Sequence, residues 1–157
     1  MVNFLFSFRY AFNGICKAII TGRNFRVQLV FALYILLFAP IVLKSVAEWA
    51  IMFTCIGIVM ALECLNSAIE RCCDYICKDK HHDIEFVKDV SAGAVLIVSI
   101  CSACVGVALF CLNGRFFELI SFCSSHLWYL IVLIALTFLG AAFISGICFK
   151  RNGDKNE

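Results

Sequence analysis

The stretch WAIMFTCIGIVMALECLNSAIERCCD, residues 49–74, decides how this chain must fold. Its first part, residues 49–69, is almost continuously apolar and is as long as the roughly 20 residues that a helix needs to cross a bilayer. Before that run ends, it already contains a carboxylate at Glu63 and an amide at Asn66. Polar groups at membrane depth face the bundle interior or water, which makes these two residues functional candidates.

Three further apolar runs predict an all-α integral membrane protein, with spans at residues 27–43, 49–69, 90–112 and 127–149. The chain is 63% hydrophobic, well above the roughly 45–50% of soluble domains. Arg9, Asn13 and Lys17 recur at every fourth position, which predicts an amphipathic surface helix over residues 1–22. Residues 113–126 form a connector that opens with a turn at Asn113-Gly114 and then skims the membrane surface.

The basic residues predict the orientation of these spans. The 13 Lys and Arg residues divide as four, one, four, one and three among the five segments outside the spans. Positive charge stays in the cytoplasm, so we expect the N-terminus, the loop between the second and third spans, and the tail at residues 150–157 to be cytoplasmic.

The same composition argues against other classes of protein. A net charge of +2 with no basic cluster gives no indication of nucleic-acid binding. The 11 cysteines lie mostly in apolar runs, which is typical of reduced packing residues. Cys72, Cys73 and Cys77 lack a matching second pair of ligands, so the sequence does not predict a zinc site.

The acidic residues gather around the second cytoplasmic loop. On a helix, Glu63, Glu70 and Asp74 lie within about 40° of one another, with Asn66 about 60° from Glu63. One face of this predicted helix therefore carries carboxylates at successive depths, from within the membrane to its surface. An alternative is a purely structural polar network, in which a neutral Glu63 bonds Asn66 and Glu70 pairs with Arg71 or Lys88.

Lys88 and Asp89 are expected at the start of the third span, at the same membrane surface. A cation beside carboxylates suits phosphates with a divalent ion, because Mg²⁺ uses one or two carboxylates and completes its shell with phosphate and water. Asp89, unlike Lys88, is also explained by a second role, that of a cap at the N-terminus of the helix. His81 and His82 are a weak metal signal by themselves.

Four stretches resemble the small bacterial membrane lipid kinases, the family that contains prokaryotic diacylglycerol kinase and undecaprenol kinase. They are ECLNSAIERCCD, residues 63–74; FRYAFNGI, residues 8–15; GRNFRVQLVFA, residues 22–32; and His81 followed by KDVSAGAVLI, residues 88–97. The resemblance extends from about residue 8 to residue 112. It implies a lipid-kinase domain over residues 1–112, with an amphipathic surface helix, three membrane helices, and a homotrimer whose active sites are shared between subunits.

The resemblance also implies an activity and its residues. The family transfers the γ-phosphoryl group of ATP to a lipid hydroxyl with Mg²⁺, at the cytoplasmic face of the bacterial inner membrane. The matching positions are Glu63 as catalytic base, Asn66 as the amide that positions the substrate, Glu70 as metal and nucleotide ligand, Lys88 and Asp89 as phosphate and ribose contacts, and Tyr10 and His81 as further nucleotide contacts.

Two departures from the family qualify this reading. Gly22 stands where the family has a metal-binding glutamate, so metal coordination must depend on Glu70, with Asp74 or Asp89 as additional candidates. The span at residues 127–149 lies beyond the family pattern. The sequence leaves diacylglycerol and undecaprenol open as substrates, with a catalytically silent membrane scaffold or a small transporter as alternative functions.

Overall fold

The computed structural model describes residues 2–77, 81–111 and 114–146. This part of the chain is all-helical, in agreement with the predicted fold class. Its helices are α1 Val2–Thr21, α2 Arg23–Val42, α3 Val46–Ile76, α4 His82–Cys111, α5 Arg115–Ser125 and α6 Leu127–Ile144.

Four of these helices, α2, α3, α4 and α6, are long and apolar enough to cross a membrane. The protein is therefore an all-α integral membrane protein with several membrane-spanning helices, and the additional fourth span corresponds to α6. The tail at residues 150–157 lies outside the described residues, as does the end of the predicted fourth span.

Helices α3 and α4 continue well past the predicted spans, and this corrects one expectation. We expected Lys88 and Asp89 at the start of a helix, but α4 already begins at His82. The acidic residues in its first turn are Asp83 and Glu85, so Asp89 lies inside the helix and is not its cap. Beyond the apolar runs most side chains of the two helices are exposed, and the ion pair between Lys88 and Asp74 joins α4 to α3 there.

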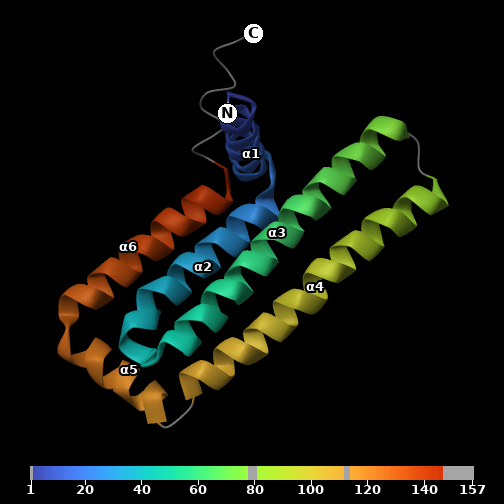
Figure 1. The fold of residues 1–157 in the computed structure, drawn as a ribbon. Coiled ribbons are helices and arrows are strands. Elements are labelled where there is room, and N and C mark those ends of the chain that lie inside the picture. Colours follow the sequence, from blue (N-terminus) through green and yellow to red (C-terminus); the bar gives the residue numbers. More distant parts are fainter. Residues whose placement is uncertain (1, 78–80, 112–113, 147–157) are drawn as a thin grey trace.

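The long helices lie side by side in the order α6, α2, α3, α4, with successive long helices antiparallel (Figure 1). At one end of the bundle α3 ends and α4 begins; we call this the site end. At the opposite end, the α5 end, α5 crosses below α2 and α4 (Figure 1). The arrangement leaves α3 in contact with both α2 and α4, so its polar face lies between them.

The α5 end is closed by an apolar cluster and by ion pairs. Its buried side chains are Ala39, Val42, Leu43, Met52 and Leu109. Ser45 and Glu48 form a capping box at the start of α3, in which each side chain accepts the other residue's backbone N–H. Arg115 of α5 lies 2.9 Å from the Glu48 carboxylate, and Lys44 lies 3.0 Å from Glu118.

This end also contains the predicted connector. It consists mainly of helix α5, whose preceding residue Gly114 has a left-handed backbone with φ 76°. Glycine adopts that conformation without a Cβ penalty, which agrees with the predicted turn. Asn113 lies outside the described residues.

Helix α6 packs on α2 through polar contacts within the apolar layer. The Tyr34 hydroxyl donates to Thr137 Oγ1 at 2.9 Å, and the Tyr129 hydroxyl donates to the backbone carbonyl of Leu37. Gly140 allows close approach, since a Cβ there would lie 3.1 Å from Val30 Cγ1. Small residues and interhelical hydrogen bonds are what hold helices together in lipid, where no hydrophobic force draws them together.

Candidate functional site

The polar face of α3 turns inward at Glu63 and Asn66, which are each only 3% exposed. The next carboxylate along this face, Glu70, is exposed. The face therefore runs from a buried carboxylate, through a buried amide, to a carboxylate in contact with solvent at the site end. The increase in side-chain exposure along this face follows from the helical spacing of the residues and from the position of α3 between α2 and α4.

Asn66 is the centre of the hydrogen bonding at this site. Its Nδ2 donates to Glu70 Oε1 at 3.1 Å, and its Oδ1 accepts from Ser91 Oγ of α4 at 2.6 Å. Ser91 Oγ also lies 2.9 Å from the backbone carbonyl of Lys88. Because the amide is bonded on both sides, its orientation is fixed.

Glu63 differs from its neighbours in having no such partner. Within the described ranges, no hydrogen bond or ion pair joins Glu63 to another residue, and Asn66 bonds Glu70 and Ser91 instead. The structural network considered from the sequence, with Glu63 bonded to Asn66, is therefore not what forms. A carboxylate on a largely buried residue that has no protein partner stays available to a substrate, and such carboxylates are typical of functional sites.

Lys88 faces α3, as expected for a residue that shares the site. Its ammonium forms an ion pair with the Asp74 carboxylate at 2.5 Å. The Asp74 side chain is 67% exposed and that of Lys88 is 35% exposed, so this pair is accessible from solvent and weakly stabilising. The structure thus brings together Glu63, Asn66, Glu70, Asp74 and Lys88.

The remaining predicted nucleotide contacts lie outside this cluster. Asp89 is exposed on α4, and Tyr10 is 73% exposed on α1. His81 is exposed, with its Nδ1 3.7 Å from Asp83. For the residues whose placement is described, no contact joins any of these three to Glu63, Asn66 or Glu70.

A magnesium site is not preformed by protein side chains alone. No group of three or more His, Cys, Asp or Glu side chains is placed to hold a metal among the described residues. The oxygen donors that are present nevertheless suit Mg²⁺, because Glu70 is exposed and Mg²⁺ takes most of its ligands from phosphate and water. Glu70 and, one turn further, Asp74 are the carboxylates available at the solvent side.

Gly22, the position of the missing acidic residue, lies between α1 and α2 and faces α3. A Cβ at this position would lie 3.6 Å from Ser67 Oγ, one helical turn after Glu63. It would also lie only 2.7 Å from the backbone oxygen of Ala18. Position 22 is therefore adjacent to the site, but a side chain there would require the close turn between the two helices to shift.

Two structural residues of this region were not identified from the sequence. Ser91 follows Lys88 by three residues, a spacing that places both on one helix face and that could have revealed it. Arg26 is 7% exposed, and its guanidinium donates to the carbonyls of Ile19 and Ile20 in α1 and of Ile144 in α6. It joins the C-terminal ends of two helices that are far apart in the sequence, and no local pattern indicates that.

Comparison with known proteins places this geometry in context. The family model for prokaryotic diacylglycerol kinase matches residues 9–110. An undecaprenol kinase from Bacillus subtilis is 39% identical over 108 residues, which cover 68% of this chain and 87% of that protein. A diacylglycerol kinase from Synechocystis is 34% identical over 108 residues, which cover 68% of this chain and 62% of that protein. No solved structure matches the chain.

Proposed function

Because the chain belongs to the prokaryotic diacylglycerol kinase family and is a lipid kinase, we propose that it phosphorylates a membrane lipid alcohol at the polar face of α3. The observation that carries the proposal is the buried carboxylate of Glu63, which has no partner among the described residues, beside an amide that is held in place by Glu70 and Ser91. Such an arrangement keeps one carboxylate available for a substrate.

In this proposal Glu63 is the general base. The lipid hydroxyl donates its proton to the Glu63 carboxylate as its oxygen attacks the γ-phosphorus of ATP, and the bond from that phosphorus to the bridging oxygen breaks to release ADP. A base must lie within hydrogen-bond reach of the proton that it takes, and the depth of Glu63 suits a hydroxyl that arrives from the lipid side. Asn66 positions the reacting groups.

Glu70, Lys88 and Asp89 are proposed to hold the nucleotide at the solvent side of this face. When bound with ATP, Mg²⁺ neutralises charge on the phosphates. Glu70 is its first protein ligand, with Asp74 or Asp89 as the second. Lys88 is well placed to exchange its exposed pairing with Asp74 for a phosphate, since an exposed ion pair contributes little to stability. Tyr10 and His81 are proposed as further nucleotide contacts.

Several features of the proposal extend beyond the site. The basic residues favour a site end in the cytoplasm of a bacterial inner membrane, where ATP is available. A homotrimer, in which a neighbouring subunit completes each site, would bring additional groups to exposed Asp89 and Tyr10. The lipid is diacylglycerol or undecaprenol, since relatives of this chain bear both names.

The test is phosphoryl transfer by the purified protein in mixed micelles, with Mg-ATP and either diacylglycerol or undecaprenol. We expect Glu63→Gln to lower kcat by roughly 10²–10⁴, the usual contribution of a general base. Glu85→Gln, which removes an exposed carboxylate in the first turn of α4, is the control and retains the wild-type rate. If Glu63→Gln equals wild type, Glu63 is not the base. If the wild type phosphorylates neither lipid, a catalytically silent scaffold or a small transporter is favoured.

A further inference from the structure

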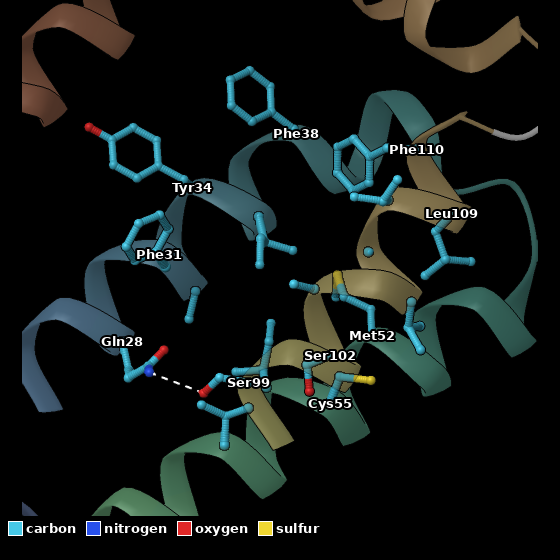
Figure 2. A pocket seen from close by; sticks show the side chains of 18 of the residues that line it. Gln28, Phe31, Tyr34, Phe38, Met52, Cys55, Ser99, Ser102, Leu109 and Phe110 are labelled. Carbon is cyan, nitrogen blue, oxygen red and sulfur yellow. Dashed lines mark hydrogen bonds between the residues drawn. The ribbon is translucent and has the colours of Figure 1, made fainter. Parts of the chain in front are cut away.

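A cavity of about 430 Å³ lies between α2, α3 and α4 (Figure 2), and we call it the central cavity. Its lining is mostly apolar and at the α5 end includes Met52 and Leu109. Toward the site end the lining includes Val59, which lies one helical turn before Glu63 on the same face of α3. The central cavity is therefore the apolar space that adjoins the proposed base.

Tyr34 and Phe38 belong to the α2 wall of the central cavity. They are one helical turn apart, so both side chains lie on the same face of α2. Tyr34 also lines a smaller cavity of about 220 Å³ between α2 and α6, and it is common to the linings of both cavities. The Tyr34 ring therefore has open space on two sides, and packing alone does not fix its rotamer.

A hydrogen bond to α6 fixes this ring instead. The Tyr34 hydroxyl points away from Met52 and Ser99 (Figure 2) and donates to Thr137 Oγ1 at 2.9 Å. Thr137 Oγ1 in turn donates its own proton to the carbonyl of Leu133 at 2.8 Å. Because a hydroxyl has a single proton, the Thr137 oxygen accepts from Tyr34, and the direction of the bond is set. Inside a bilayer no water replaces that acceptor.

Helix α6 also holds the next turn of α2. The Tyr129 hydroxyl donates to the backbone carbonyl of Leu37, and the centroid of the Tyr129 ring lies 6.1 Å from that of Phe38. Centroid separations of roughly 4.5–7 Å are typical of favourable aromatic pairs. Two aromatic side chains of the α2 wall, one turn apart, are thus each in contact with a residue of α6.

We propose that α6 braces the α2 wall of the central cavity, and that Thr137 is a positioning residue that holds Tyr34 against the hydrocarbon of the lipid substrate. The inference rests on the proposed function, and it gives a role to a helix that lies beyond the residues matched by the family model. Because Tyr34 is already ordered in the free protein, lipid binding does not have to order it and retains more of its free energy.

The variants that test the brace change one hydrogen bond. Thr137→Val removes the acceptor with little change in side-chain shape, and Tyr34→Phe removes the donor. Thr137→Ser keeps the hydroxyl and should behave as wild type. Thr54→Val is the matched control, because Thr54 is also exposed on a membrane-spanning helix and donates to the carbonyl of Ala50, but has no bond to α2 among the described residues.

The first experiment measures phosphoryl transfer with the lipid that the wild type uses, diacylglycerol or undecaprenol, at varied lipid and ATP concentrations. We expect Thr137→Val to raise KM for the lipid about two- to ten-fold, the factor that corresponds to ordering one side chain on binding, and to leave kcat and KM for ATP unchanged. Tyr34→Phe should have the same effect, and the double variant should be no worse than either single variant, because both remove one bond.

Three results of this experiment would overturn the proposal. The first is a loss that appears in kcat with an unchanged KM for the lipid, which indicates a general structural defect. The second is an equal rise in that KM for Thr137→Ser or Thr54→Val. The third is a double variant in which the effects of Thr137→Val and Tyr34→Phe multiply, because independent effects do not come from one shared bond.

The second experiment does not depend on catalysis. The four tyrosines are replaced by 3-fluorotyrosine, and fluorine NMR is recorded in mixed micelles without ATP, with Tyr34→Phe identifying the Tyr34 signal. We expect Thr137→Val to shift that signal before lipid is added, Thr137→Ser and Thr54→Val to leave it in place, and diacylglycerol or undecaprenol to shift it in the wild type. These shifts support the brace even if no phosphorylation occurs and the proposed function fails. A Tyr34 signal that Thr137→Val leaves unmoved, or that neither lipid shifts, overturns it.

Discussion

Arg26 provides the sharpest test of how the added helix is held to the rest of the protein. Its guanidinium donates to Ile19 O at 3.0 Å, to Ile20 O at 2.9 Å and to Ile144 O at 3.3 Å. These carbonyls belong to the last turns of α1 and α6, where backbone oxygens lack helical partners and the helix dipole is negative. Arg26→Met keeps most of the aliphatic stem and removes these hydrogen bonds to α1 and α6.

The expected cost follows from these contacts. A hydrogen bond from a charged donor contributes about 1.5–3 kcal/mol. The two bonds to α1 have good lengths, whereas the one to α6 is long and contributes less. We therefore expect Arg26→Met to lower the free energy of unfolding by about 3–5 kcal/mol, allowing for partial hydration of the α1 carbonyls.

The measurement is reversible unfolding of the purified protein in mixed micelles, followed by helical circular dichroism as the fraction of denaturing detergent is raised. Hydrogen exchange should increase at the C-terminal turns of α1 and α6 and stay unchanged at the α5 end. Arg23→Met is the matched control, because it removes the same charge from an exposed position three residues away. The reasoning is refuted if Arg26→Met destabilises the protein no more than Arg23→Met does.

Three further predictions concern other contacts. Arg115→Met should lower the free energy of unfolding, because it removes the cation that pairs with the Glu48 carboxylate. Adding Glu48→Gln should recover part of that loss in the same unfolding assay, and a double variant no more stable than the single one would contradict this. Gly22→Ala should cost about 1–3 kcal/mol, since its Cβ would lie 2.7 Å from a backbone oxygen and the backbone must shift; wild-type resistance to thermal inactivation would show that the turn has room. Lys88→Met should leave the free energy of unfolding nearly unchanged, because its pair with Asp74 is exposed, yet it should raise KM for ATP. An unchanged KM would remove Lys88 from the proposed nucleotide site.

Periodicity within a helix was sufficient to predict the polar face of α3. The spacing of Glu63, Asn66 and Glu70 fixes their shared direction on one helix, whatever the neighbouring helices do. For the same reason the four apolar runs predicted the four helices that are long enough to span a membrane. The helix ends were less predictable, because α3 and α4 continue past the apolar runs into segments whose side chains are mostly exposed and polar, where hydrophobicity gives no boundary.

The sequence by itself determined the membrane class, the number of long apolar helices and the candidate face of α3, since these depend on hydrophobicity and on the geometry of a single helix. Only the tertiary structure decided which neighbours that face meets. It bonds Asn66 to Ser91 and leaves Glu63 without a partner among the described residues. Arg26 likewise reaches Ile144, which is 118 residues away in the chain. Such contacts depend on the rotation and register of one helix against another, and those are fixed by packing across the whole bundle rather than by any local pattern.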